Sequence, residues 1–419
     1  MRKENIRPSS EIANFSWNAI GSAANTIPSL ILLMIVTQIL GKVAAAPFAI
    51  AFTTAQILLA VGLYGIRNYQ VTDISDMYST GVYISSRTIT SLGMIVIGLL
   101  YCLVSRYDIT KTALFFVLII SKMSESISDV FYGIMQKKGK LYIAGISMSV
   151  RTVITVLLFY FSLSAFHNLL LSSALLAAAG YIPILLIDLP VSRRMDSTKP
   201  LFDKQKIINL LRICFPIFAA SIMPIIVINL PKYVIERTMA DEFQTIYNII
   251  VMPGTAIVLF SQIIVQSFLV KLAYYRSKAL MSRFVGLISA VILMVGLFTG
   301  LWMVLLNFWG RDLLLLLYGL ELGSYIPQLL IVLVGAMLCS IAIIFSVALT
   351  TLRVTKIQLY LFVINLVSAL AISVYLIPRF GLSGAANSYL LIMLIQVLLY
   401  AVVFAREIYR LKKYPGELA

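Results

Sequence analysis

Four ionisable residues lie within long apolar runs of this 419-residue sequence. Lys122, Glu125 and Asp129 follow one another at spacings of three and four residues, so on a helix they occupy one stripe about 60° wide. Arg151 lies in the next apolar run. Charges within membrane spans are costly, and they normally face a cavity or a partner. These four residues are therefore the first candidates for function.

An arginine beside a lysine suits an anionic head group. The guanidinium fork binds phosphate or diphosphate in a bidentate manner, and the ammonium adds a point charge. Glu125 or Asp129 would limit the positive charge of the empty site or bind a coupling proton or sodium ion. Glu125 and Arg151 stand at equal distances from the basic turn at 137–140, so we expect them at similar depth on antiparallel helices. Two interpretations stay open: the charges line a cavity, or they form a neutralised structural pair.

A later apolar run, residues 213–234, is interrupted by three prolines, which permit a membrane helix to bend. Asn229, Lys232 and Glu236 lie on one side of its outer end. We interpret Lys232 as reaching to the membrane interface. A gating or outer-exit role for the three residues is the alternative.

Arg67 and Arg87 flank the polar segment that follows the second run. They are candidates for the rim of a cytoplasmic entrance. The alternative is that they anchor lipid phosphates.

The composition places all of these residues in a membrane protein. Hydrophobic residues make up 61 % of the chain and charged residues 12 %, and the mean hydropathy is +0.98. Soluble domains carry about 25 % charged residues. The net charge of +16 does not indicate nucleic-acid binding, because the basic residues fall in short breaks between apolar runs. We therefore expect an all-α, multi-pass protein of the cell membrane.

Metal and thiol chemistry have little support. Cys102, Cys214 and Cys339 are far apart and each lies in an apolar run, which suggests neither a disulfide framework nor a thiolate metal site. His167 is the single histidine, whereas a zinc or iron site normally needs several ligands. We interpret it as an interfacial residue, and we expect no metal and no cofactor.

The apolar runs predict about twelve membrane spans, each near the required length of about 20 residues. Of the 33 Lys and Arg residues, 24 fall in alternate connections and tails, six in the other connections and three within spans. The positive-inside rule therefore places both termini in the cytoplasm. The predicted spans are 14–40, 44–66, 88–104, 112–135, 142–164, 169–189, 213–234, 245–269, 284–307, 326–351, 358–378 and 385–405.

Two cytoplasmic breaks are longer than the others. In residues 67–87, Val71, Ile74 and Tyr78 share one helical face, which suggests a helix lying on the membrane surface. Residues 190–212 carry six basic residues and form a linker that divides the chain into six spans and six spans. We therefore predict two six-helix bundles, 1–195 and 196–419, a common plan among transporters.

At this point the sequence resembles the polysaccharide transporter family, the lipid-linked oligosaccharide flippases of the multidrug/oligosaccharidyl-lipid/polysaccharide exporter (MOP) superfamily. The resemblance covers nearly the whole chain and includes the six-plus-six organisation. The segments that carry it are NFSWN at 14–18, GIRNYQVTD at 65–73, ESISD at 125–129 with QKKG at 136–139, and FGLSGAA at 380–386.

The resemblance implies a MATE-like fold and alternating access. A polyprenyl-pyrophosphate-linked oligosaccharide would enter a central cationic cavity from the cytoplasm and leave at the outer face, driven by a proton or sodium gradient. Charged cavity residues of such proteins lie in the N-terminal half, as Lys122, Glu125, Asp129 and Arg151 do. The implied partners are membrane lipids, the lipid-linked glycan, and the glycosyltransferases and polymerase that act before and after it.

Two alternatives compete with a flippase. A multidrug/cation antiporter of the same superfamily would favour an anionic cavity, whereas Lys122 and Arg151 here offset Glu125 and Asp129. A membrane-embedded glycan polymerase would be an enzyme, and such enzymes typically need large outer loops and candidate acid and base groups. The predicted outer loops are short, so we expect a transporter rather than an enzyme.

Overall fold

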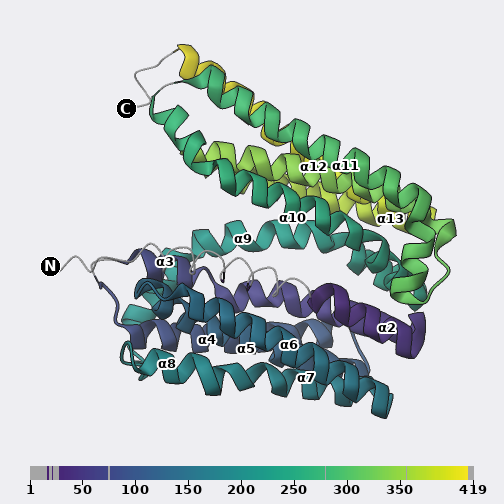
Figure 1. The fold of residues 1–419 in the computed structure, drawn as a ribbon, viewed down its shortest axis with the longest axis horizontal. Helices are drawn as coiled ribbons and strands as arrows, with labels where there is room; N and C mark the ends of the chain where they lie inside the picture. Colours follow the sequence, from purple (N-terminus) through teal and green to yellow (C-terminus); the bar gives the residue numbers. More distant parts are fainter. Residues whose placement is uncertain are drawn as a thin grey trace. The chain divides into compact units, whose positions relative to one another are not determined.

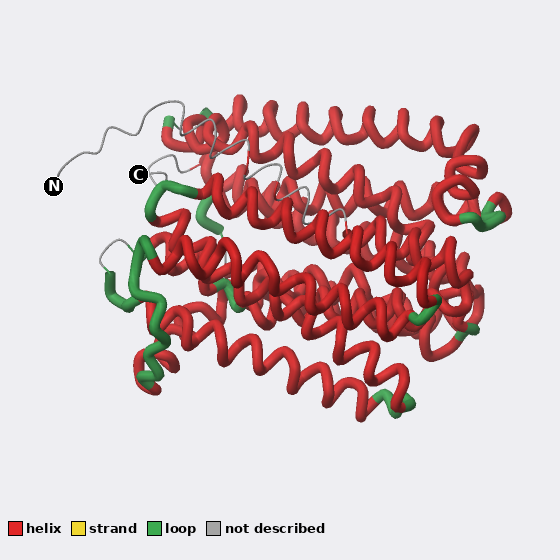
Figure 2. Tube along the Cα trace, turned by 60° about the horizontal axis from the view of Figure 1, so that its bottom comes forward, coloured by secondary structure: helices red, strands yellow, loops and turns green. Residues whose placement is uncertain are grey.

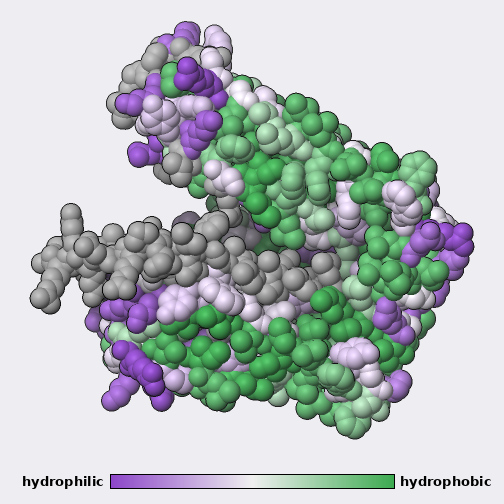
Figure 3. Space-filling view, viewed as in Figure 1, coloured by the Kyte–Doolittle hydropathy of each residue, from purple (hydrophilic) through white to green (hydrophobic). Residues whose placement is uncertain are grey.

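The computed structural model describes residues 28–413 except 74–75, 279 and 355, together with Trp17 and Gly21. The chain forms two compact units, Met1–Ile222 and Met223–Ala419. The described residues are helical and joined by short loops (Figures 1 and 2). In each unit, hydrophobic residues cover the middle of the visible face and hydrophilic residues gather toward the ends, as expected for helices that cross a membrane (Figure 3).

Unit 1 is built around one central helix. This helix, α5 (Ile109–Lys137), packs against each of the other long helices of the unit, so residues on most of its sides are removed from lipid. The helices of unit 1 are α2 (Pro28–Leu63), α3 (Ile66–Thr72), α4 (Thr80–Val104), α5, α6 (Leu141–Phe166), α7 (Leu169–Pro183), a π-helical turn η1 (Ile184–Asp188) and α8 (Leu189–Arg193).

Unit 2 has a corresponding centre in α12 (Ile326–Thr351), which packs against α10, α11 and α13. The division between the units falls within the long helix α9 (Lys204–Thr238). The predicted boundary near residue 195 therefore stays a prediction. The other helices of unit 2 are α10 (Asp241–Ser277), α11 (Met281–Tyr318), a short 3₁₀ turn η2 (Gly323–Tyr325) and α13 (Lys356–Lys413).

Two of the longest helices are broken at glycines. Gly41 in α2 has φ 81° and ψ 174°, and Gly381 in α13 has φ 57° and ψ −135°. These left-handed and extended conformations are accessible to glycine without a Cβ clash. A Cβ on Gly384 would also collide with the Leu376 carbonyl oxygen, so glycine permits the tight return after Gly381. Both breaks coincide with predicted connections between spans, at 41–43 and 379–384.

Nine of the described helices are long and apolar enough to cross a membrane. α5 is not among them, because Lys122, Glu125 and Asp129 reduce its apolar character. The predicted first span, residues 14–40, lies largely outside the described residues. From residue 44 onward every predicted span overlaps a helix of the structure.

The prediction for residues 67–87 is wrong in two respects. α4 begins at Thr80 and not at residue 88, so the break is limited to residues 73–79. The polar residues Ser85 to Arg87 resemble a loop in hydropathy, yet they are buried in helix packing. The described residues also contain no surface helix that runs from Val71 to Tyr78. α3 ends at Thr72, and Tyr78 lies after that end and is buried. Ile74 is not among the described residues.

The break at 73–79 is organised by Asp73. Its carboxylate accepts hydrogen bonds from the Met77 and Tyr78 amides at 3.0 and 3.1 Å and from the Tyr83 hydroxyl at 2.8 Å. Burial alone would raise the pKa of Asp73, but these hydrogen bonds, with help from Lys137, lower it below its ordinary value. The carboxylate thus fixes the loop that leads into α4.

Candidate functional site

The described charged residues inside unit 1, on α5 and the helices that pack against it, form three separate ion-pair groups. The first is internal to α5: Lys122 Nζ lies 2.6 Å from Glu125 Oε1, and the ammonium also lies 4.9 Å from the centre of the Phe52 ring on α2. Lys122 is 4 % exposed. The second oxygen of Glu125 is buried without a hydrogen-bond partner among the described residues. This pair is therefore neutral overall, but it keeps one free acceptor.

The second pair joins Arg151 on α6 to Asp188 at the end of the π-helical turn. Arg151 Nη2 lies 3.4 Å from Asp188 Oδ2 and also donates to the Ser128 hydroxyl, which in turn donates to Asp188 at 2.7 Å. Asp188 is completely buried. A buried carboxylate of this kind requires a partner, because an uncompensated charge costs several kcal/mol. Arg151 supplies that partner.

Asp188 is a site residue that the sequence analysis missed. It lies at the very end of the predicted span 169–189, where a carboxylate is easily interpreted as interfacial. The available signal was Pro183, five residues earlier. Proline cannot donate a backbone hydrogen bond, and the helix widens to a π-turn over Ile184–Asp188. Such π-turns frequently mark functional sites.

The third pair centres on Asp129 and involves both candidate entrance residues. Arg87 Nη2 lies 2.6 Å from Asp129 Oδ2, and Arg67 Nη1 lies 3.2 Å from Asp129 Oδ1. Arg87 also donates to the Gly62 carbonyl oxygen at 2.7 Å, and Arg67 donates twice to Gln136 Oε1. These contacts tie the end of α2, α3 and α4 to the central helix.

The expected arrangement of these residues needs two corrections. Arg87 is 1 % exposed, so it is a buried anchor for Asp129 and not part of an open rim. Arg151 pairs with Asp188 and not with Glu125. Helical periodicity placed Lys122, Glu125 and Asp129 on one stripe, but neighbouring helices decide which partner each charge meets.

Lys122, Glu125 and Arg151 nevertheless share one small cavity. Its walls come from α2, α5, α6 and α7, and its volume of about 20 Å³ is room for roughly one water molecule. The three residues thus lie together, and their role in lining a substrate cavity stays a prediction. Asp129 is not part of the wall. The other wall residues are Pro28, Leu32, Phe52, Ser121, Ser124, Thr152, Thr155, Leu176 and Gly180.

The gating candidates lie in unit 2, in the last part of α9. Asn229 donates to the Ile225 carbonyl oxygen of its own helix at 2.8 Å. Lys232 is half-buried, and Glu236 lies beyond it before the helix ends at Thr238. Their role in gating or exit stays a prediction.

Metal-binding chemistry finds no support in the described part of the chain. Within it, no three His, Cys, Asp or Glu side chains gather as a metal site would require. His167 is exposed in the turn between α6 and α7, at φ 49°.

The chain is similar to known proteins in sequence and, more widely, in fold. No family model matches the sequence. The sequence is 26 % identical over 405 residues to the capsular polysaccharide biosynthesis protein CapF of Staphylococcus aureus, covering 94 % of this chain and 99 % of the relative. Its structure is similar to the inward-facing conformation of a multidrug resistance MATE family transporter of the MOP superfamily, with a TM-score of 0.72 and 12 % identity over 95 % of this chain and 99 % of the other.

The chain has a MATE-like fold. The lipid II flippase MurJ, in an inward closed conformation, is also similar, with a TM-score of 0.64 and 14 % identity over 94 % of this chain and 87 % of MurJ. Together with the nine long apolar helices, the MATE-like fold makes this an all-α, multi-pass membrane protein. The same fold therefore accommodates proteins named for drug resistance and for lipid II transfer.

Proposed function

We propose that this protein is a flippase that moves a polyprenyl-pyrophosphate-linked oligosaccharide from the cytoplasmic to the outer leaflet by alternating access. The observation that carries the proposal is the charge balance inside unit 1. Four cations, Arg67, Arg87, Lys122 and Arg151, stand against three carboxylates, Asp129, Asp188 and Glu125. Asp73, in the loop after α3, is not part of these ion-pair groups, so the groups carry one net positive charge, which suits an anionic lipid diphosphate better than a cationic drug.

The geometry suggests how a diphosphate would be held. Lys122 is bound to Glu125 by a single short contact, so a diphosphate oxygen can take the place of the carboxylate once alternating access opens this one-water cavity. Arg151 stays oriented by Asp188 and Ser128, and its Nε is buried without a partner among the described residues. The released Glu125 is then the candidate to bind a coupling proton or sodium ion. The similarity to a capsular polysaccharide biosynthesis protein supports the polysaccharide class of cargo.

The proposal includes a topology of twelve spans in two six-helix bundles with both termini in the cytoplasm. In this topology the 137–140 turn is cytoplasmic and the turn at His167 is outside. The three natural cysteines are buried, so single cysteines introduced at Gly139 and His167 can be labelled with little background. Labelling of both from the same side of the membrane would contradict the topology.

Loss of the cationic side chains tests the function. We expect Lys122→Ala, and the paired change Arg151→Met/Asp188→Leu that leaves no buried carboxylate uncompensated, to abolish surface polysaccharide in cells that depend on this protein, while the amount of protein in the membrane is unchanged. Lys206→Ala is the matched control, because this lysine is exposed at the start of α9 and, among the described residues, its ion pair is with Asp203 just before that helix. Normal surface polysaccharide with Lys122→Ala would contradict the proposed role of the charged interior.

A further inference from the structure

A second and much larger cavity lies away from the charged interior, at the end of unit 1 where α5 finishes. Its volume is about 510 Å³, within the range of about 300–1,000 Å³ typical of small-molecule sites. The cavity at Lys122 has room for only about one water molecule. The lining comes from α3, the 73–79 loop, the start of α4, the end of α5 and the segment after α8: Gln70, Asp76, Tyr78, Ser79, Thr80, Tyr83, Ile134, Lys137, Lys138 and Asp196.

The wall after α8 is fixed by specific contacts. The Thr80 hydroxyl donates to Asp196 at 2.7 Å, and the Leu201 amide donates to the Gly81 carbonyl oxygen at 3.0 Å. A Cβ on Gly81 would lie 2.5 Å from the Lys199 carbonyl oxygen, so glycine is needed for this close approach. The segment that carries Asp196 is thus held against the start of α4, and the cavity has a defined side wall.

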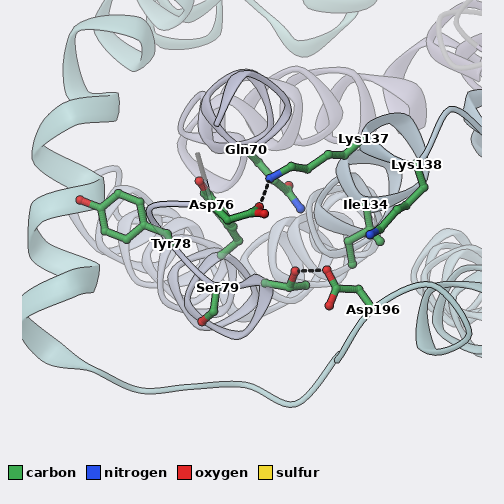
Figure 4. Close-up of a pocket in the computed structure, with 10 residues that line it drawn as sticks. Gln70, Asp76, Tyr78, Ser79, Ile134, Lys137, Lys138 and Asp196 are labelled. Atoms are coloured by element: carbon green, nitrogen blue, oxygen red, sulfur yellow. Dashed lines mark hydrogen bonds and ion pairs between the residues drawn. The ribbon is translucent and has the colours of Figure 1, made fainter. Parts of the chain in front are cut away.

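The charges around this cavity cancel. Lys137 lies 2.6 Å from Asp76 and also donates to the Asp73 carbonyl oxygen, and Figure 4 shows it pointing toward Asp76. Asp196 contributes a second carboxylate. Lys138 forms no ion pair within the part of the chain that the structure describes. One positive charge is therefore available for a ligand, next to two carboxylates that would repel a multiply charged anion.

Hydrogen-bond acceptors in the wall point to a ligand with hydroxyl groups. The Asp76 and Asp196 carboxylates lie in the lining, and each ionised oxygen can accept more than one hydrogen bond. Gln70 Oε1, in contrast, is buried against Gly133 of α5 and is closed to a ligand. A phosphate diester has no hydrogen to offer to Asp76 or Asp196, whereas a sugar hydroxyl donates and accepts.

Aromatic rings complete the cavity. Tyr78 and Tyr83 line it with their rings 6.1 Å apart in an edge-to-face arrangement, and Figure 4 shows Tyr78 on the opposite side of the view from Asp196. Tyrosine presents an apolar body and a polar tip, which matches the C–H faces and hydroxyl edges of a sugar ring.

We propose that this cavity is a binding site for a sugar unit that carries hydroxyl groups and one negative charge, such as a uronic acid residue. Resting on the proposed flippase function, it would hold a sugar of the lipid-linked glycan during loading on the cytoplasmic side. Lys138 meets the negative charge, Asp76 and Asp196 accept sugar hydroxyls, and Tyr78, backed by the buried Tyr83, packs on the ring. The charged interior would hold the diphosphate, so the two sites would recognise different parts of one substrate.

Direct binding tests the sugar site without any transport assay. The probes are glucuronate, glucose and inorganic phosphate, added to the purified full-length protein in detergent and followed by saturation-transfer NMR. We expect glucuronate to bind the natural protein and Lys138→Glu to weaken that binding at least tenfold. Lys140→Glu is the matched control, because it makes the same charge change two residues away at an exposed position outside the lining. It should bind as the natural protein does.

The other outcomes separate the two proposals. Equal glucuronate binding by the Lys138→Glu and Lys140→Glu variants, or no glucuronate binding at all, would overturn the sugar site. Competition by phosphate at the same concentration as glucuronate would show a simple anion site and would overturn it too. Normal surface polysaccharide with Lys122→Ala, alongside Lys138-dependent glucuronate binding, would instead remove the proposed flippase role and leave the sugar site standing.

Discussion

The two units of this protein share a central-helix plan but differ in what their interiors contain. Among the described residues, the fully buried charged side chains all belong to unit 1: Asp73, Arg87, Lys122, Arg151 and Asp188. The interior of unit 2 instead holds amides and hydroxyls. Asn365 donates to Gln396 at 3.3 Å, and Ser346 donates to Gln358 at 2.7 Å.

The two kinds of polar group differ in what they cost the folded protein. Neutral hydrogen bonds fix helix contacts at modest cost, whereas buried charges are costly unless each is paired. Unit 2 packs its apolar residues Val332, Cys339 and Tyr389 around α12. Unit 1 contains three buried ion-pair groups that lower its stability, and the described interior of unit 2 contains no such group. Retaining such costly groups in one unit suggests that unit 1 carries the substrate and ion chemistry.

The largest effect should come from breaking the Arg151–Asp188 pair. Asp188→Ala leaves Arg151 buried without its carboxylate, and we expect a loss of about 3–5 kcal/mol in the free energy of unfolding. Thermal unfolding in detergent measures the loss. The double variant Arg151→Met/Asp188→Leu removes both charges and should recover most of it. An unfolding midpoint for Asp188→Ala equal to that of the natural protein would show that this pair contributes nothing to folding.

A smaller effect is expected for the corresponding change in unit 2. Gln396→Leu removes the acceptor for Asn365, and an unsatisfied neutral group of this kind costs about 1–3 kcal/mol. The same unfolding measurement applies, with Asn365→Leu/Gln396→Leu as the control that removes both partners. If Gln396→Leu cost more than Asp188→Ala, the contrast between the two interiors would lose its energetic basis.

The smallest effect concerns acid sensitivity at the Asp73 loop. Because the pKa of Asp73 is lowered in the folded protein, the folded state binds fewer protons than the unfolded state near the ordinary value of 3.8. Its stabilisation is complete well above that value and is lost as the pH falls through the folded pKa. The thermal unfolding midpoint of Asp73→Asn should therefore change less between about pH 5 and pH 3 than the midpoint of the natural protein does.

Glu321→Gln in unit 2 is the control for this measurement. Glu321 also has a lowered pKa, because the Arg311 side chain donates hydrogen bonds to it, but both groups are exposed and screened by solvent. We expect the unfolding midpoint of Glu321→Gln to change with pH as much as that of the natural protein. If it changed as little as that of Asp73→Asn, Asp73 would contribute no more to the acid sensitivity of folding than an exposed carboxylate does.

Much of the helical framework could be predicted from hydropathy, because an apolar run of about 20 residues has few alternatives in a membrane. The breaks at Gly41 and Gly381 fell between predicted spans. The start of α4 could not be predicted in this way. Ser85, Ser86 and Arg87 are polar by composition and are buried by their neighbours, which hydropathy cannot register.

The candidate site was predicted in part. Intramembrane charge identified Lys122, Glu125 and Arg151, and the structure brings them to one cavity. The pattern of intramembrane charge did not identify Asp188, because a carboxylate at the end of a span resembles an interfacial residue. The pattern also did not predict that Asp129 pairs with Arg67 and Arg87. The partners of these charges come from helices distant in the sequence.

The sequence by itself determined that this is a polytopic helical membrane protein, that its basic residues concentrate in alternate connections between the predicted spans, and that α5 cannot present its polar stripe to lipid. Periodicity and the cost of exposing charge to hydrocarbon are properties of a single helix and can be computed from residue order. Only the tertiary structure decided which charge meets which partner and that a 510 Å³ polar cavity forms beyond α5. Those outcomes depend on how several helices pack together, and residue order along one helix does not contain that information.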